Sequence, residues 1–134
     1  MTDHITSLLP IETFPPAVAQ GCVCLECRTD DQRTNDLLAP LDDPASRTAL
    51  TVERMFLREL NGSCRTPIAG YATLEGDAIQ FHGLIASFDG QQVFEDRVSG
   101  SVSDPEQLGQ ETGRVLREKA GARFMAEMAA QSAG

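Results

Sequence analysis

The sequence predicts an α+β fold, in which a three-stranded antiparallel sheet has helices packed on one face. Three strand candidates follow one another near residues 67–75, 78–87 and 92–99, and Glu75-Gly76-Asp77 and Asp89-Gly90 separate them. Separations of this length that contain Asp and Gly are typical of β-hairpins. Helical patterns precede and follow the strands. A small sheet between two helical stretches is expected to bury one face beneath them.

The helix before the sheet is expected to begin at Pro44. Asp43 is a favourable N-cap residue, and proline suits the first helical position. Apolar residues then recur at helical spacing, at Ala49, Val52, Phe56 and Leu60. Asn61-Gly62 supplies a residue that tolerates the left-handed conformation, which ends the helix.

The helix after the sheet is expected to begin at Asp104-Pro105. Its apolar side is formed by Leu108, Val115 and Leu116. Gly121 is expected to break this helix, because glycine disfavours a helix interior. A last helix then runs through Phe124, Met125 and Met128.

The first 43 residues have a different pattern. The stretch CVCLEC, Cys22 to Cys27, favours a short strand buried on both faces. A short helix is expected behind it, capped by Thr29 or Asp30 and limited by Pro40. One strand and one short helix cannot bury their apolar faces alone. This segment is therefore expected to be a piece of a sheet whose other strands lie elsewhere.

Composition and charge exclude several classes of protein. The chain has 11 Lys and Arg against 20 Asp and Glu, a net charge of -9. This balance argues against a nucleic-acid partner and would repel a polyanionic ligand. No run approaches the roughly 18 apolar residues of a membrane span, and the N-terminus lacks the pattern of a signal peptide. We expect a cytoplasmic protein with reduced thiols and no membrane partner.

Three of the four cysteines lie in the predicted strand. Strand alternation places Cys22 and Cys24 on one face and Cys27 on the other. Zinc sites of the knuckle type use C-x2-C on a turn, with a matching pair downstream. Only Cys64 follows, and the two histidines lie at no ligand spacing. We therefore expect no metal site, and we interpret the first three cysteines as small buried hydrophobic residues.

Cys64 differs from the other cysteines. It lies in LNGSCRTPIAGYA, on a loop between a helix end and a strand, where packing gives no reason for a thiol. Gly62 lets the backbone turn, and the neighbouring Arg65 can favour the thiolate. On spacing alone, an incidental loop cysteine and a functional thiol both remain open.

The same stretch resembles the cofactor-attachment loop of the porphobilinogen deaminase (hydroxymethylbilane synthase) family, whose pattern runs Leu-x-Gly-Gly-Cys-x-x-Pro-Ile. A second block agrees: residues 16–21, Pro-Ala-Val-Ala-Gln-Gly, resemble the family's Pro-Ala-x-Gly-Gln-Gly stretch. Ala19 and Ser63 stand where the family usually has glycine, and we expect local adjustment there. The likeness covers nearly the whole chain.

The resemblance implies that the chain is the last part of a three-domain enzyme. Residues 1–43 would be a hinge and a strand-helix remnant of the preceding domain, and residues 44–134 the C-terminal dipyrromethane-cofactor-attachment domain. Domains one and two would supply the catalytic residues and the basic pocket. No catalytic residue is then expected in this chain, which would be inactive alone although the full-length protein is a transferase.

The family condenses four porphobilinogen molecules into hydroxymethylbilane, with loss of ammonia, in haem biosynthesis. The resemblance implies a dipyrromethane cofactor held by a thioether to Cys64, absent from this chain when it is alone. A thiolate suits the soft carbon electrophile that porphobilinogen becomes when it loses ammonia. Gln20 and Gly21 match a segment near the family's pocket, so they are candidate cofactor contacts; a tight crossover between domains is the alternative. The implied partners are porphobilinogen, pyrrole-chain intermediates, and domains one and two.

A second function class remains open. The chain could be a stand-alone small binding or regulatory module without catalytic activity. Coding sequence before Met1 distinguishes the two hypotheses, because an enzyme portion requires domains one and two in frame.

Overall fold

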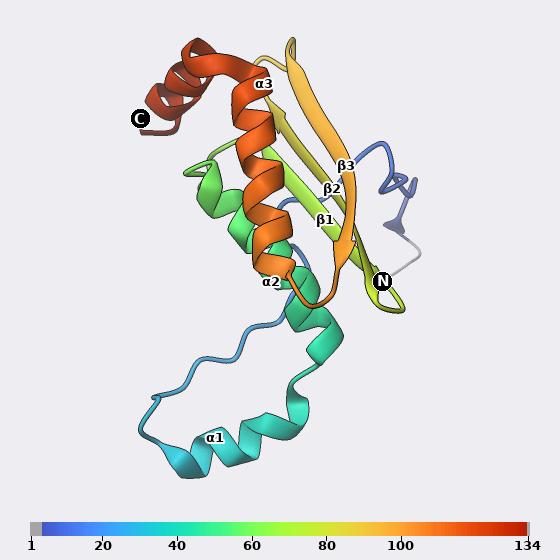
Figure 1. Cartoon of the computed structure of the whole chain (residues 1–134), viewed down its shortest axis with the longest axis vertical. Helices are drawn as coiled ribbons and strands as arrows, with labels where there is room; N and C mark the ends of the chain where they lie inside the picture. The colour runs from blue at the N-terminus through green and yellow to red at the C-terminus, as the bar shows by residue number, and fades with distance from the viewer. Residues whose placement is uncertain (1–3, 134) are drawn as a thin grey trace.

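A computed structural model describes residues 4–133 of the chain (Figure 1). Three strands form one antiparallel sheet in the order β1-β2-β3: β1 (Ile68–Glu75), β2 (Ala78–Ala86) and β3 (Val93–Ser101). Helices α2 (Pro44–Glu59) and α3 (Pro105–Ala133) pack on one face of this sheet (Figure 1). The predicted α+β class and the three-stranded meander are confirmed. No helix within residues 4–133 is long and apolar enough to cross a membrane.

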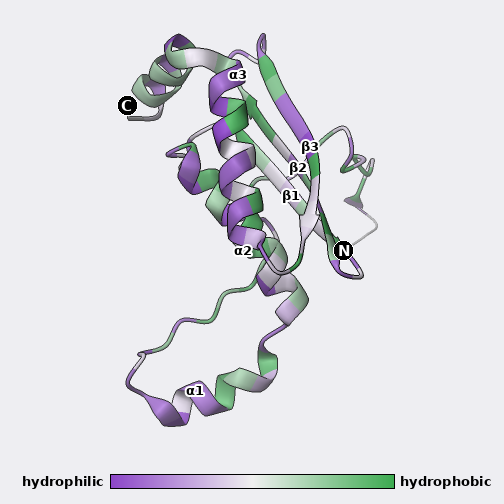
Figure 2. Ribbon diagram, in the orientation of Figure 1, coloured by the Kyte–Doolittle hydropathy of each residue, from purple (hydrophilic) through white to green (hydrophobic). Residues whose placement is uncertain are grey.

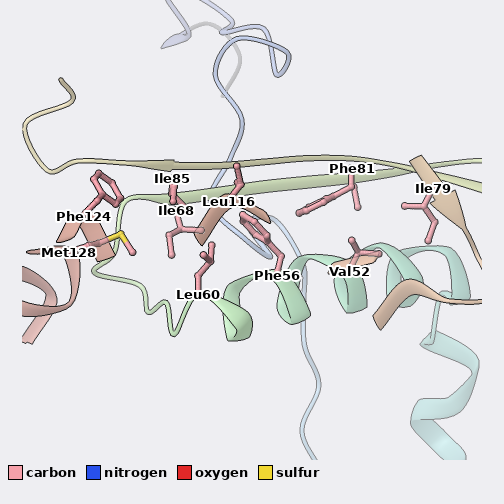
Figure 3. Packing of buried hydrophobic residues seen from close by; sticks show 11 residues of the cluster. Val52, Phe56, Leu60, Ile68, Ile79, Phe81, Ile85, Leu116, Phe124 and Met128 are labelled. Carbon is pink, nitrogen blue, oxygen red and sulfur yellow. The ribbon is translucent and has the colours of Figure 1, made fainter. Parts of the chain in front are cut away.

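The hydrophobic core lies between the sheet and the two helices. Figure 3 shows Val52 and Phe56 of α2, and Leu60 at its C-cap, pointing toward the sheet. The rings of Phe56 and Phe81 meet edge to face, with centroids 5.2 Å apart. Side chains of the strands and of α3 complete the buried cluster, namely Ile68, Ala72, Ile79, Phe81, Ile85, Leu116, Phe124 and Met128.

Two glycines allow α2 and α3 to approach closely. A Cβ atom at Gly109 would overlap the carbonyl oxygen of Val52 and lie 3.0 Å from the amide nitrogen of Phe56. A Cβ atom at Gly113 would lie 2.7 Å from Cβ of Glu59. Side chains at these two positions would therefore push the helices apart, because backbone atoms cannot move aside as a flexible side chain can.

Both ends of α2 form as predicted. The carboxylate of Asp43 accepts a hydrogen bond from the Ser46 amide at 2.8 Å, and Pro44 is the first helical residue. At the other end, the Asn61 amide donates to the Arg58 carbonyl and the Gly62 amide to the Leu57 carbonyl. With Asn61 at φ 52°, these bonds make a Schellman motif. Helix α3 breaks at Gly121 (φ 81°), also as predicted.

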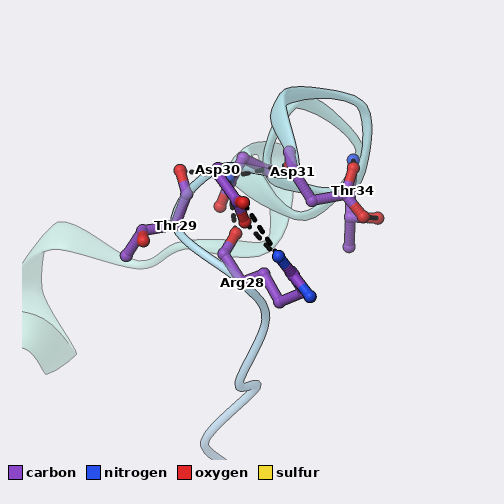
Figure 4. A network of polar contacts seen from close by, with 6 residues as sticks. Arg28, Thr29, Asp30, Asp31 and Thr34 are labelled. Carbon is purple, nitrogen blue, oxygen red and sulfur yellow. Dashed lines mark hydrogen bonds and ion pairs between the residues drawn. The ribbon is translucent and has the colours of Figure 1, made fainter.

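The N-terminal segment contains α1 (Gln32–Leu38) and a short 3-10 turn, η2 (Ala39–Leu41), which lie away from the sheet (Figure 1). The predicted N-cap is wrong by one or two residues: the cap is Asp31, whose carboxylate accepts from the Thr34 amide and hydroxyl (Figure 4). Asp30 instead pairs with Arg28, with Nη2 and Oδ2 2.9 Å apart. Asp31 is the cap because its carboxylate, rather than that of Asp30, accepts the Thr34 amide of the first turn.

The strand predicted over Cys22–Cys27 does not form. Residues 22–28 are extended, but within the described part of the chain no strand lies beside them to complete a ladder. A strand requires such a neighbour, and local β propensity cannot replace it. The apolar side chains here and in α1 remain exposed, with Val23 86% and Leu37 68% accessible. Figure 2 shows hydrophobic residues along the end of α1, far from the core.

Candidate functional site

Cys64 lies on the loop between the end of α2 and the start of β1. The loop begins beside the core, at Gly62. A Cβ atom at Gly62 would overlap Cδ1 of Leu57 and lie 2.6 Å from Cδ1 of Ile68. A larger residue at position 62 would therefore require the Leu57 and Ile68 side chains to shift.

Ser63 and Thr66 close the loop on itself. The Ser63 amide donates to Thr66 Oγ1 at 2.8 Å, and the Thr66 hydroxyl donates to the Ser63 carbonyl at 2.6 Å. The Arg65 amide donates to Ser63 Oγ at 3.2 Å. Cys64 and Arg65 lie exposed on the turn that these bonds form. Ser63 thus contributes both its backbone and its hydroxyl to the turn.

The four cysteines are all free thiols, but their surroundings differ. Cys22 and Cys24 are exposed on the extended segment, so the prediction that they are buried hydrophobic residues is wrong. Cys27 is half-buried, and its Sγ lies 3.0 Å from Oδ1 of Asn35. Within residues 4–133, no three His, Cys, Asp or Glu side chains are grouped so that they could hold a metal ion.

A hollow of about 350 Å³ lies beside the Cys64 loop. Its walls come from the end of α2, the loop and the last part of α3: Leu60, Asn61, Thr66, Arg117, Met125, Met128, Ala129 and Ser132. Arg117 lies between α3 and α2, where its Nη2 is 3.6 Å from Oε1 of Glu59. Part of the Cys64 loop therefore faces this hollow instead of packing against α3.

Gln20 and Gly21 directly follow a segment that lies along the edge of β1. Ala17 pairs with Ala69 in an isolated antiparallel bridge, and the Gly70 amide donates to the Pro16 carbonyl at 3.1 Å. The side chain of Gln20 turns back, and its Oε1 accepts from the Ala17 amide at 3.1 Å. The structure thus brings residues 16–19 and the Cys64 loop to the same half of β1, whereas the Gln20 side chain serves its own turn.

Glu53 is a polar residue of this region that sequence reasoning missed. It is buried on α2, and its Oε2 accepts from the Ala19 amide at 2.8 Å while Oε1 accepts from the Ala72 amide at 3.0 Å. Burial raises the pKa of this carboxyl above its ordinary value, although the two amide donors act in the opposite direction. The sequence contained a sign of it, because Glu53 falls on the apolar face of the helical pattern.

The basic side chains of the helices are spread over the surface and are largely paired with carboxylates. Such exposed pairs contribute little to stability. Near the Cys64 loop, Arg65 lies on the turn itself, and Arg58 and Arg117 line hollows that Asn61 also lines. The pairs made by basic residues of the helices are Arg47–Asp42, Arg114–Glu111, Arg114–Glu118, Arg117–Glu59, Lys119–Asp96 and Arg123–Glu127.

Comparison with protein families decides what this arrangement belongs to. Residues 47–118, more than half of the chain, match the family described as "Porphobilinogen deaminase, C-terminal domain". The chain belongs to this family. The matched range runs from α2 into α3, so it includes the Cys64 loop, the sheet and Glu53. The predicted family is thereby confirmed.

Two porphobilinogen deaminases illustrate the likeness. The proteins of Nitrobacter hamburgensis and Nitrobacter winogradskyi are 44% and 43% identical to this chain over 124 residues. Each alignment covers 92% of this chain but only 39% of the relative. The chain therefore spans about two fifths of the length of these porphobilinogen deaminases.

Proposed function

We propose that this chain is the C-terminal portion of a porphobilinogen deaminase, and that Cys64 anchors a dipyrromethane cofactor. The full-length protein would be the transferase that joins four porphobilinogen molecules into hydroxymethylbilane, with loss of ammonia, in tetrapyrrole biosynthesis. The observation that carries the proposal is an exposed thiol on a closed turn, in a chain of this family.

The Cys64 loop fits a covalently attached group. Cys64 is exposed, whereas the bonds between Ser63 and Thr66 hold the turn beneath it. A substituent on Sγ can extend away from the domain without displacing any core side chain. Cys22 and Cys24 are also exposed, but they lie on a segment that no neighbouring strand holds.

The thiol suits the attachment chemistry. In the net substitution, the sulfur of Cys64 bonds to the aminomethyl carbon of porphobilinogen, ammonia leaves, and the thiol proton departs with the amine. Sulfur is the softest nucleophile among the side chains, which matches the soft carbon formed when ammonia is lost. A thioether at that carbon also ionises less readily than an oxygen ether. When bound, the cofactor would supply the pyrrole end on which the product is built.

The remaining machinery would lie in the rest of the enzyme. A growing pyrrole chain carries many carboxylates, and this chain, with a net charge of -9, would repel it. Residues 22–41, with exposed apolar side chains on an extended segment and a short helix, would complete the sheet of the preceding domain. Residues 1–43 would accordingly belong to a hinge and that domain, and residues 44–134 to the cofactor-attachment domain.

A chimaera tests the role of Cys64. The N-terminal part of the Nitrobacter hamburgensis relative is fused to this chain, expressed, and examined by intact mass and by turnover of porphobilinogen. We expect a mass increase of two deaminated porphobilinogen units in the parent chimaera. Cys64→Ser should remove this increase and most of the turnover, because oxygen cannot replace the sulfur anchor. Cys24→Ser, at another exposed thiol, is the matched control and should retain both.

Two outcomes would contradict the proposal. A Cys64→Ser chimaera that still carried the added mass would show that another residue is the anchor. The 134-residue chain alone, incubated with porphobilinogen, should keep a free thiol and show no turnover. An adduct of two units on Cys64 in that sample would show that domains one and two are not needed for assembly.

A further inference from the structure

Glu53 joins three elements that are distant in sequence. Its two carboxylate oxygens each accept one backbone amide, from Ala19 in the N-terminal segment and from Ala72 in β1. Ala72 lies at the outer edge of the sheet, because β1 pairs only with β2 among the described strands. The buried carboxylate of Glu53 thus accepts one backbone amide from the edge strand and one from the segment that lies beside it.

The segment that Glu53 holds makes only a short contact with the sheet. Its backbone contributes the Ala17–Ala69 bridge and the Pro16 carbonyl, which accepts from the Gly70 amide. Val18 packs against the core, with Cγ2 3.1 Å from where a Cβ of Gly70 would lie. Beyond Ala19 the chain leaves the sheet. Within the described residues, the bond from the Ala19 amide to Glu53 is the last hydrogen bond between this segment and the sheet or α2 before the chain departs.

The backbone turns sharply at this point of departure. Ala19 has φ 63° and Gly21 has φ 86°, so two left-handed residues flank Gln20. A non-glycine residue in this region costs energy that the surroundings must offset. The hydrogen bond from the Ala19 amide to a buried carboxylate is suited to this task, because charged acceptors make stronger bonds than neutral ones.

We propose that Glu53 is a positioning residue, a latch that holds residues 16–19 on β1 and so sets where Gln20 and Gly21 lie relative to the Cys64 loop. The significance of Gln20 and Gly21 rests on the proposed function, whereas the latch itself does not. When the latch is removed, the segment separates from β1 while the sheet and helices stay folded. The route of the chain into the preceding domain then loses its fixed starting point.

Amide hydrogen exchange of the 134-residue chain, resolved by residue, tests the latch. Glu53→Met keeps a side chain of similar length but removes both acceptors, and replacing a buried charge in this way often leaves a domain stable. Glu53→Gln offers one carbonyl oxygen for two amide donors. Glu59→Gln, on the same helix and not bonded to the segment, is the matched control.

We expect exchange at Ala19 and Gly70 to rise by about tenfold or more in Glu53→Met, since a bond to a charged group is lost. Glu53→Gln should show a smaller rise at the same amides, and Glu59→Gln none. The amides of β2 should change by less than about twofold in all three variants. Unchanged exchange at Ala19 and Gly70 would overturn the latch. An equal rise throughout β2 in both Glu53 variants would also overturn it, because Glu53 would then support the whole domain.

A nitroxide on Cys64 measures positioning directly. With Cys22, Cys24 and Cys27 replaced by serine, the label's broadening of the Gln20 and Gly21 amide signals is compared with its effect on Ile68. In Glu53→Met, broadening at Gln20 and Gly21 should change while that at Ile68 stays the same. Identical broadening in both proteins would show that Glu53 does not set their position. Neither measurement depends on cofactor attachment, so failure of the latch and failure of the proposed anchor are distinguishable.

Discussion

Residues 44–133 and residues 4–43 contain similar apolar side chains but bury them very differently. The buried hydrophobic cluster is drawn wholly from α2, its C-terminal end, the sheet and α3. Most of the large exposed hydrophobic side chains, by contrast, lie in the first 41 residues, among them Ile5, Leu8, Phe14, Val23, Leu25, Leu37 and Leu41. Composition does not separate the two regions. What separates them is whether the described chain supplies a partner surface.

The boundary between the two regions is not a simple point in the sequence. Residues 16–19 precede the exposed segment, yet they lie on β1 and Val18 packs against the core. The chain then leaves the sheet, passes through α1 and returns at Asp43 to begin α2. Burial is therefore gained first by residues 16–19 and later by the sheet with α2 and α3, whereas most of the residues between them stay exposed.

The largest difference that this comparison predicts is in hydrogen exchange. Amides of Val23–Cys27 should exchange at nearly the rate of an unfolded chain, because none of them donates a hydrogen bond within the described residues. Amides of Ile79–Ile85 should exchange only by opening of the domain, which corresponds to about 5 kcal/mol or more. Equal protection of the two stretches in a monomer would show that the N-terminal segment is a folded part of the same unit.

A substitution where α2 and α3 touch should destabilise residues 44–133 and leave residues 4–43 unaffected. Gly109→Ala places a methyl group against the backbone of α2, and we expect the free energy of unfolding to fall by about 3 kcal/mol. Urea denaturation followed by circular dichroism measures this loss. Gln107→Ala, exposed on the same helix, is the control and should change stability by less than about 0.5 kcal/mol. Equal urea midpoints for the two variants would mean that α2 and α3 can move apart without loss of stability.

The smallest effect is expected where the two regions meet. Ala19 has a left-handed backbone, so Ala19→Gly should relieve strain and stabilise the docked segment by about 0.5–1 kcal/mol. Slower exchange of the Gly70 amide is the measurement. Ala17→Gly, two residues earlier and without a left-handed backbone, should have the opposite effect because it only adds freedom to the unfolded chain. Faster exchange of the Gly70 amide in Ala19→Gly would show that the left-handed backbone of Ala19 is not strained.

The site was predictable from sequence to unequal degrees. The position of Cys64 on a loop could be predicted because Asn61-Gly62 marks the helix end, whereas spacing left open whether its thiol is functional. Its closed turn could not, because the bonds between Ser63 and Thr66 depend on the path of the backbone. Glu53 was visible only as a carboxylate on an apolar helix face. Its partners Ala19 and Ala72 are ordinary residues whose role arises from contacts across the fold.

The sequence by itself determined the elements whose signals are local. The N-cap at Asp43, the left-handed Asn61, the glycines of the two hairpin turns and the break at Gly121 are all decided within a few residues. Only the tertiary structure decided the fate of Cys22–Cys27, since an apolar run becomes a strand only beside another strand. The same holds for Glu53, because two amide donors and a buried environment must be brought to one carboxylate. Local propensity acts along the chain, whereas pairing and burial require surfaces that only folding brings together.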